Sequence, residues 1–116
     1  MLKFVNFTNH PSERWDDVQT REAEKYGEIV DVSFPSVSPK LSQDEIREMS
    51  ESYVLEILRQ EPAAVLCQGE FTLCFAVVEK LKSKGIPVLA ACTKRIVEED
   101  GDSKIVKFRF EGFREY

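Results

Sequence analysis

The chain has 116 residues, of which 42% are hydrophobic and 32% charged, and its formal net charge is −5. A chain of this size and composition can enclose its own core, so we expect one domain spanning residues 1–116. The acidic balance argues against a general binder of duplex nucleic acid, and no long apolar run or leader indicates a membrane or secreted protein, so a cytoplasmic location is expected.

The first two predicted elements are a strand and a helix. Residues 2–7 are rich in strand-forming side chains and predict the first strand. Pro11 and Ser12 then form a helix start signal, in which Ser12 caps a helix that carries Trp15 and ends at Gly27.

A second strand is predicted at residues 28–34, followed by an irregular connection that contains Pro35 and Pro39. Ser42 and Glu45 have the spacing of a capping box and predict the start of an amphipathic helix. The apolar positions of that helix are Ile46, Met49, Tyr53, Val54, Ile57 and Leu58.

Residues 63–67 are nearly all apolar, which is typical of a central parallel strand covered on both faces. A largely buried helix follows from Phe71 to the cap at Gly85, and residues 87–92 predict a fourth strand. Strands that alternate with helices through short joints predict right-handed crossovers and one parallel sheet.

The last quarter of the chain predicts a β-hairpin, because Asp100-Gly101 is a strong two-residue turn signal. Alternation places Val106, Phe108 and Phe110 on one face, assigned to the core or a dimer surface, and Lys107 and Arg109 on the other. The predicted fold class is therefore α/β: a Rossmann-like three-layer sandwich with a parallel central sheet and a C-terminal β-hairpin.

Polar side chains follow three of the predicted strands, in turns at residues 8–12, 68–72 and 93–95. In a parallel α/β sheet these turns share the edge where ligands bind, so one common site is expected. The ligand-binding candidates are Thr8, Asn9, Ser12, Gln68, Gly69, Phe71, Thr72 and Thr93.

The turn at residues 68–72 has two explanations. Gly69 would let a phosphate approach the backbone N–H groups at the start of the next helix. A tight turn of this kind commonly needs glycine in any protein, however, and Glu70 can simply complement the helix dipole. Neither a Gly-x-Gly-x-x-Gly fingerprint nor a P-loop is present, so a nicotinamide dehydrogenase or an NTPase is not indicated.

The remaining chemical candidates are His10, Lys94 and Arg95. His10 is the only histidine and could move a proton near neutral pH, or it could be a surface turn residue. Lys94 and Arg95 follow the fourth strand and could hold phosphate, or they could be the solvated start of the hairpin. One histidine among scattered carboxylates has no metal-ligand spacing, so no metal is expected.

The cysteines have no Cys-x-x-Cys pairing and lie in apolar segments: Cys67, Cys74 and Cys92. This pattern favours reduced, buried packing residues over a disulfide framework or a zinc site.

Four stretches, at residues 6–12, 68–73, 89–95 and 113–116, together resemble the small CRISPR-associated proteins of the Csx group, specifically the family numbered twenty, which is related to nucleotide-binding CARF domains. The resemblance covers almost the full length. It implies a cytoplasmic ring nuclease of type III CRISPR antiviral defence. Such a protein binds cyclic oligoadenylate, here cyclic tetra-adenylate, across a homodimer and opens the ring to end signalling.

The resemblance also implies metal-independent phosphodiester cleavage without a cofactor, in which a ribose 2′-hydroxyl attacks its neighbouring phosphorus. Lys94 and Arg95 would stabilise the phosphorane, His10 or Glu70 would transfer protons, and backbone N–H groups near Gly69 would hold a phosphate oxygen. This chain has Cys92-Thr93 where related proteins have a serine, so no protein nucleophile is assigned. Two other classes remain open: a protein that binds the ring without cleaving it, and a structural subunit that binds no adenylate.

Overall fold

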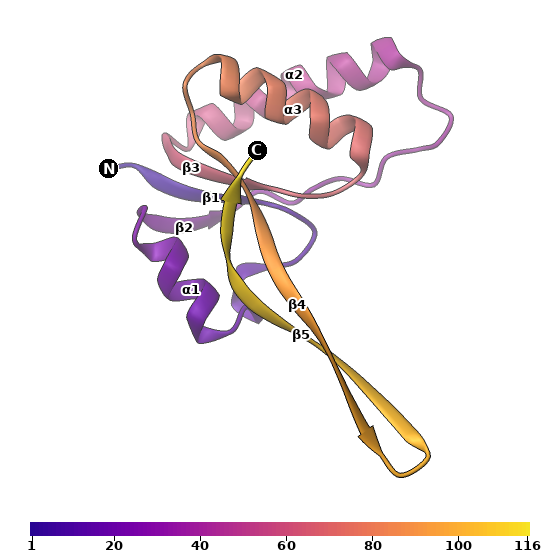
Figure 1. Ribbon diagram of the computed structural model, residues 1–116. Helices are drawn as coiled ribbons and strands as arrows, with labels where there is room; N and C mark the ends of the chain where they lie inside the picture. The colour runs from indigo at the N-terminus through magenta and orange to yellow at the C-terminus, as the bar shows by residue number, and fades with distance from the viewer.

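Five strands form one mixed sheet in the computed structural model, which describes residues 1–116 (Figure 1). The strands are β1 (Lys3–Phe7), β2 (Glu28–Asp31), β3 (Pro62–Cys67), β4 (Val88–Asp100) and β5 (Ser103–Glu115). Their order across the sheet is β2-β1-β3-β4-β5. The first four are mutually parallel and β5 is antiparallel to β4, which confirms an α/β chain with a C-terminal hairpin, in a sheet that is mixed rather than wholly parallel.

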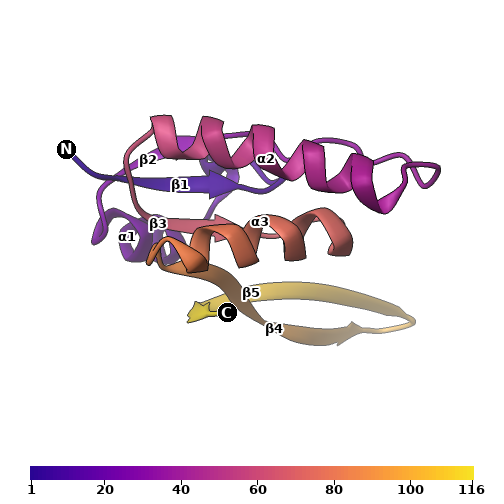
Figure 2. The ribbon, with the colours of Figure 1, turned by 90° about the horizontal axis from the view of Figure 1, so that it is seen from above.

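The helices cover both faces of this sheet. They are a 3₁₀ turn η1 (Ser12–Arg14), and the α-helices α1 (Asp17–Glu24), α2 (Gln43–Arg59) and α3 (Phe71–Ser83). Helix α1 lies on one face, while α2 and α3 pack side by side on the other (Figures 1 and 2). No helix is long and apolar enough to cross a bilayer.

Side-chain alternation along β1 divides the core between these two faces. Val5 and Phe7 belong to the larger apolar cluster, which α2 and α3 complete. Phe4 points the other way and packs with Trp15 and Ala23 of the segment that contains η1 and α1. The nearly all-apolar β3 contributes to both clusters, as expected of a strand buried on two faces.

The helix start signals were predicted correctly in one case and incorrectly in another. Helix α2 begins with the predicted capping box, in which the Ser42 side chain accepts from the Glu45 N–H and the Glu45 side chain accepts from the Ser42 N–H. Ser12, however, starts only the 3₁₀ turn, and Asp16 caps α1 instead. The turn does not continue into α1 because Trp15 is extended, with a ψ of 152°.

Two strand boundaries also differ from the prediction. The second strand ends at Asp31 rather than at residue 34, although the Val32 and Phe34 N–H groups still donate to the carbonyls of Asn6 and Thr8. The fourth strand does not end at Cys92 but runs on to Asp100, because β5 pairs with it over its whole length.

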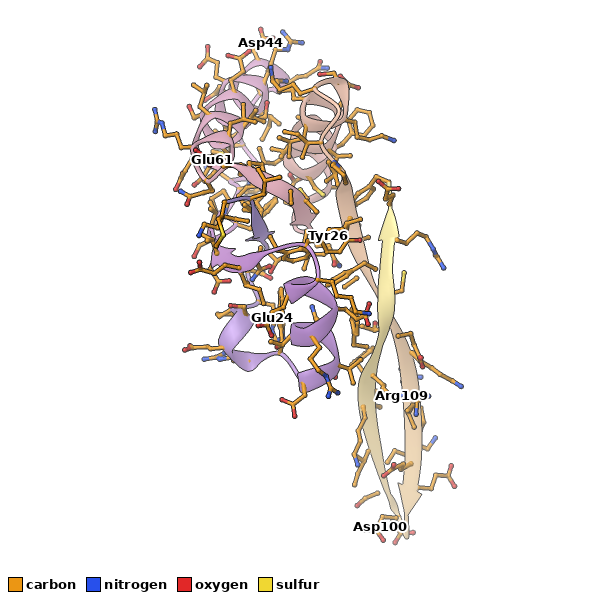
Figure 3. The ribbon with its side chains drawn as sticks, turned by 90° about the vertical axis from the view of Figure 1, so that its left-hand side faces the viewer. Glu24, Tyr26, Asp44, Glu61, Asp100 and Arg109 are labelled. Carbon is orange, nitrogen blue, oxygen red and sulfur yellow. The ribbon has the colours of Figure 1, made fainter.

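The β4–β5 hairpin projects beyond the rest of the molecule. We call the part between residues 94 and 109 the arm; its tip at Asp100 stands far from the helices, with Arg109 along its length (Figure 3). The tip turns at Gly101, whose φ of +63° lies in the left-handed region that favours glycine. The predicted turn at residues 93–95 is therefore wrong, because these residues form continuous strand.

Candidate functional site

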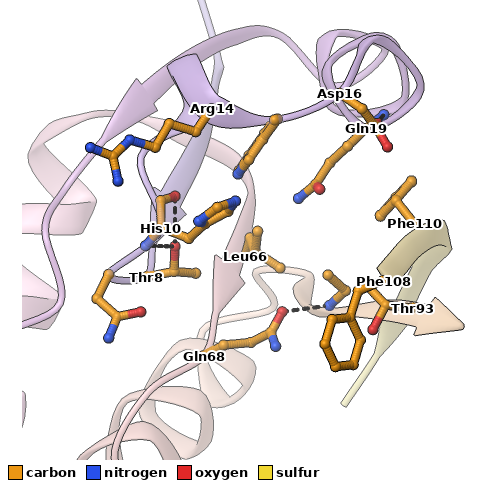
Figure 4. Close-up of a pocket in the computed structure, with 13 residues that line it drawn as sticks. Thr8, His10, Arg14, Asp16, Gln19, Leu66, Gln68, Thr93, Phe108 and Phe110 are labelled. Carbon is orange, nitrogen blue, oxygen red and sulfur yellow. Dashed lines mark hydrogen bonds between the residues drawn. The ribbon is translucent and has the colours of Figure 1, made fainter. Parts of the chain in front are cut away.

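A pocket of about 390 Å³ opens beyond the carboxyl ends of β1 and β3, beside the middle of β4 (Figure 4). The residues that line it are Thr8, Asn9, His10, Arg14, Trp15, Asp16, Gln19, Leu66, Gln68, Ala91, Thr93, Phe108 and Phe110. Its volume lies within the range of ligand pockets in proteins, about 300–1,000 Å³.

The sheet topology explains why a hollow forms here. After β1 the chain crosses one face through α1 to reach β2, and it later crosses the opposite face through α2 to reach β3 on the other side of β1. The segments that leave β1 and β3 therefore diverge at their carboxyl ends. Ligands of open α/β sheets bind in the crevice at such a switch point.

A buried hydrogen-bond network holds the loop that follows β1. Asn6 is 1% exposed, and its amide nitrogen donates to the His10 carbonyl at 3.0 Å and to an Asp31 carboxylate oxygen at 3.1 Å. The Thr8 hydroxyl donates to the side-chain oxygen of Asn6 at 2.8 Å and accepts from the His10 N–H at 3.1 Å. These bonds fix the backbone of His10, so the imidazole extends into the pocket from a rigid base (Figure 4).

Gln68 forms the opposite wall at the end of β3. Its side-chain oxygen accepts from the Ala91 N–H at 2.7 Å, and this bond bridges β3 and β4. With the oxygen engaged, the amide NH₂ group is the part of the side chain left to meet a ligand. Gln19 points into the same space from α1 (Figure 4).

Aromatic side chains supply the apolar surface of the pocket. Trp15 is held against the core by an edge-to-face contact with Phe4, at 6.2 Å between ring centroids. Phe108 and Phe110 come from β5, where Phe110 lies opposite Thr93 of β4. Phe108 is 69% exposed, so its ring is free to cover a ligand.

The charged lining consists of Arg14 and Asp16, with His10 between the walls. Asp16 is engaged as the cap of α1, accepting from the Gln19 N–H at 2.8 Å. Arg14 extends outward at the rim, away from the Phe108 side (Figure 4). One arginine and one aspartate do not make a strongly basic hollow.

Lys94 and Arg95, predicted to stabilise charge in the site, do not line this pocket. Both are exposed residues of the arm. Arg95 lies opposite Phe108 and shares its face of the hairpin, one strand repeat beyond Thr93, whereas Lys94 lies opposite Arg109 on the other face. Because β4 continues into the arm, both cations lie beyond the pocket at the ends of β1 and β3.

Gly69 and Glu70 lie outside this pocket and make structural contacts at the start of α3. A Cβ at Gly69 would lie 2.5 Å from atoms of the Phe34 ring, so only glycine leaves room for that ring at this position. The Glu70 carboxylate accepts from the N–H groups of Thr72 and Leu73 at 3.1 and 2.8 Å. These bonds lower the pKa of Glu70 and fill the helix N-terminus at which a phosphate was expected.

The Glu70 cap predicts that the stability of the protein depends on pH. The pKa of Glu70 is lowered in the folded state, so its stabilisation is present above the ordinary glutamate pKa and is lost as the pH falls through the lowered value. Glu70→Gln should reduce the free energy of unfolding at pH 7 by about 1 kcal/mol and flatten its decline in acid. Urea denaturation between pH 7 and pH 3 measures this.

The matched control is Glu79→Gln, which removes the same charge from an exposed position of the same helix. It should change stability by less than about 0.5 kcal/mol. Equal effects of the two substitutions would contradict a specific cap at Glu70.

The pocket thus brings together only part of the predicted site. The predicted residues that line it are Thr8, Asn9, His10, Gln68 and Thr93. The predicted residues outside it are Ser12, Gly69, Glu70, Phe71, Thr72, Lys94 and Arg95. Phe71 is 89% exposed on α3 and faces a different groove, and the Thr72 hydroxyl donates to Glu70.

Several lining residues were missed by the sequence prediction. Trp15 was read only as a helix position, and Arg14, Asp16 and Gln19 became neighbours through the 3₁₀ turn. Phe108 and Phe110 could have been found from the sequence. If the strand pairs are counted outward from the Asp100-Gly101 turn, these two side chains fall on the same face of the hairpin as Thr93.

The chain contains no cluster of three or more His, Cys, Asp or Glu side chains placed to hold a metal ion. All three cysteines are free, with Cys67 and Cys74 buried as predicted and Cys92 half-buried.

Comparison with known protein families gives one match, to the family described as "Uncharacterized protein MJ1673 family", over residues 2–114. No curated protein and no solved structure matches the chain. Because the match spans nearly the whole sequence, the chain belongs to the MJ1673 family.

Proposed function

We propose that this member of the MJ1673 family binds a cyclic oligoadenylate, with cyclic tetra-adenylate as the expected ring, and opens it without a metal ion. The observation that carries the proposal is the pocket at the β1/β3 switch point, which combines aromatic surfaces, side-chain amides and the sole histidine. The resemblance to the Csx ring nucleases supplies the identity of the ligand.

Recognition of an adenine base accounts for the pocket chemistry. Aromatic rings such as Trp15 and Phe108 can stack on a base. The side-chain amide of Gln19 can match the donor and acceptor edge of adenine, as Asn and Gln do in nucleic-acid complexes, and the NH₂ group of Gln68 can donate to a ring nitrogen of the base. One nucleotide of the ring would occupy each pocket.

The ring-opening step uses few protein groups. The 2′-hydroxyl oxygen attacks the adjacent phosphorus, the bond from phosphorus to the 5′-oxygen breaks, and the products are a 2′,3′-cyclic phosphate and a free 5′-hydroxyl. His10 accepts the 2′-hydroxyl proton or delivers a proton to the leaving 5′-oxygen. Arg14, the cation at the rim, pairs with a phosphate of the ring.

The fold supports the same proposal. Parallel strands in the order β2-β1-β3-β4, with helices on both faces, are the arrangement of Rossmann-like domains, to which the CARF domains belong. We assign the chain to that class, with the arm as an addition to the sheet.

We also propose that the protein forms a homodimer, because a ring with two-fold symmetry fits two equivalent pockets. The arm offers apolar surface for such contact, and its exposed apolar residues are Val97, Ile105, Val106 and Phe108. Light scattering should give twice the mass of one chain.

A non-catalytic binder is the second candidate. It is favoured by one observation: Arg14 is the only cation in the lining, and Asp16 lies in the same lining. Ring cleavage benefits from concentrated positive charge at the phosphorus, whereas sequestration of the ligand requires only base and sugar contacts.

The deciding experiment incubates the purified protein with cyclic tri-, tetra- and hexa-adenylate in the presence of a chelator, and identifies the products by mass. Linear products that end in a 2′,3′-cyclic phosphate support the ring nuclease. Intact rings recovered from a tight complex favour the sequestering protein. Failure to bind any ring would overturn both and leave a structural subunit.

A further inference from the structure

Two cysteines from different elements meet behind the Gln68 turn. Cys67 is the last residue of β3 and Cys74 lies in the first turns of α3, and their sulfur atoms are 3.6 Å apart. The sulfurs of a disulfide are about 2.05 Å apart, so these two are in contact but not bonded.

The C-terminal residue closes over this pair. The Tyr116 hydroxyl donates to the Cys67 carbonyl at 2.6 Å and lies 3.8 Å from the Cys74 sulfur. Lys82 donates to the Tyr116 carbonyl at 2.6 Å and holds the tail in place. The sulfurs are therefore surrounded by polar partners rather than by packing contacts alone.

The two thiols have different environments. The contact between the two sulfurs, in which either thiol can be the donor, lowers the pKa of Cys74 to about 7. The same contact and burial raise the pKa of Cys67. The negative charge of the nearby Glu70 carboxylate acts in the opposite direction and raises the pKa of Cys74.

Solvent access also distinguishes the two cysteines, and it favours Cys74 as the reactive one. Cys74 lines a surface pocket of about 340 Å³, together with Gly69 and Tyr116. Cys67 is fully buried and does not line that pocket. A small oxidant entering from solvent would meet the Cys74 sulfur first.

We propose that Cys74 and Cys67 form a redox-active dithiol that hydrogen peroxide, or another small hydroperoxide, converts to an intramolecular disulfide. Cys74 is the attacking sulfur and Cys67 the resolving one. This proposal goes beyond the proposed function and does not depend on it, because neither sulfur lines the His10 pocket.

The chemistry balances with peroxide as the oxidant. The Cys74 thiolate attacks one peroxide oxygen, the O–O bond breaks, and a sulfenic acid and hydroxide form. The Cys67 sulfur then attacks the Cys74 sulfur, the S–OH bond breaks, and hydroxide leaves and takes up the Cys67 proton as water. Two thiols and one hydrogen peroxide give one disulfide and two waters.

The test treats the full chain with hydrogen peroxide at pH 7 and counts its thiols after denaturation. The count should fall from three to one, with the loss of two hydrogens from the mass, and a thiol reductant should restore it. Cleavage after Glu70 separates Cys67 from Cys74, so the two peptides should stay linked only in the oxidised sample.

Cys92→Ser is the matched control, because it removes the half-buried third thiol and leaves the pair intact. It should oxidise at the wild-type rate and end with no free thiol. Cys74→Ser should lose thiols at least about tenfold more slowly.

Oxidation of Cys92 before Cys74, over-oxidation of Cys74 without a crosslink, or disulfides between chains would each overturn the proposal. The peptide map of the wild-type chain decides the matter even where Cys74→Ser does not fold.

Discussion

Replacement of His10 by alanine is expected to slow the opening of cyclic tetra-adenylate by about 10²–10⁴-fold, the usual contribution of a positioned general acid or base. The imidazole extends into the pocket from a backbone held by Asn6 and Thr8, and no other histidine can replace it. Binding of the ring should weaken far less, because stacking and amide contacts remain. Single-turnover cleavage and equilibrium binding, measured on the same preparation, separate the two effects.

Lys94→Ala is the informative control for this prediction. Lys94 was expected from the sequence to stabilise the cleaved phosphate, but it lies on the face of the arm away from Phe108. Its removal should leave the cleavage rate unchanged. A large loss with Lys94→Ala, together with full activity of His10→Ala, would move the reaction centre from the pocket to the arm.

Replacement of Asn6 by alanine is expected to lower the free energy of unfolding by about 2–4 kcal/mol, because it removes three hydrogen bonds of a buried side chain and leaves a small cavity. The lost partners are the His10 carbonyl, the Asp31 carboxylate and the Thr8 hydroxyl. Urea denaturation at pH 7 measures the change as a lower midpoint with an unchanged slope.

A second substitution separates the hydrogen bonds from the cavity. Asn6→Asp keeps the side-chain shape but replaces the amide donor with an acceptor facing Asp31, so it should be at least as destabilising as alanine at pH 7. Asn9→Ala changes an exposed neighbour and should alter stability by less than about 0.5 kcal/mol. A small effect of both Asn6 variants would show that the loop after β1 does not depend on this network.

Local signals predicted the elements well wherever the causes are local. The Ser42 and Glu45 capping box sets the start of α2, and the apolar residues of β3 mark a strand covered on both faces. In both cases the deciding residues lie within one element. Gly27 differs: the sequence predicted it as the cap of α1, but the cap is Lys25, and a side chain at Gly27 would meet the carbonyl of the distant Leu2.

The errors had both local and distant causes. Trp15 is extended after η1, so the helix expected to start at Ser12 is only a 3₁₀ turn, and Asp16 caps α1 instead. Pairing with β5 extends β4 past Cys92, which moves Lys94 and Arg95 out of the expected binding edge and onto the arm. Glu70 satisfies the helix N-terminus that had been reserved for a phosphate.

The order of residues was sufficient to establish an α/β chain with parallel strands, a C-terminal hairpin and polar loops after the strands, since periodicity and capping are encoded within short windows. Which of those polar groups share a pocket was decided by folding alone. Thr8, His10, Gln68 and Thr93 meet there because β1 and β3 end side by side next to the middle of β4, while Trp15 and Phe108 complete the walls from segments far apart in the chain. Distances between such segments depend on packing and strand register, which no short stretch of sequence contains.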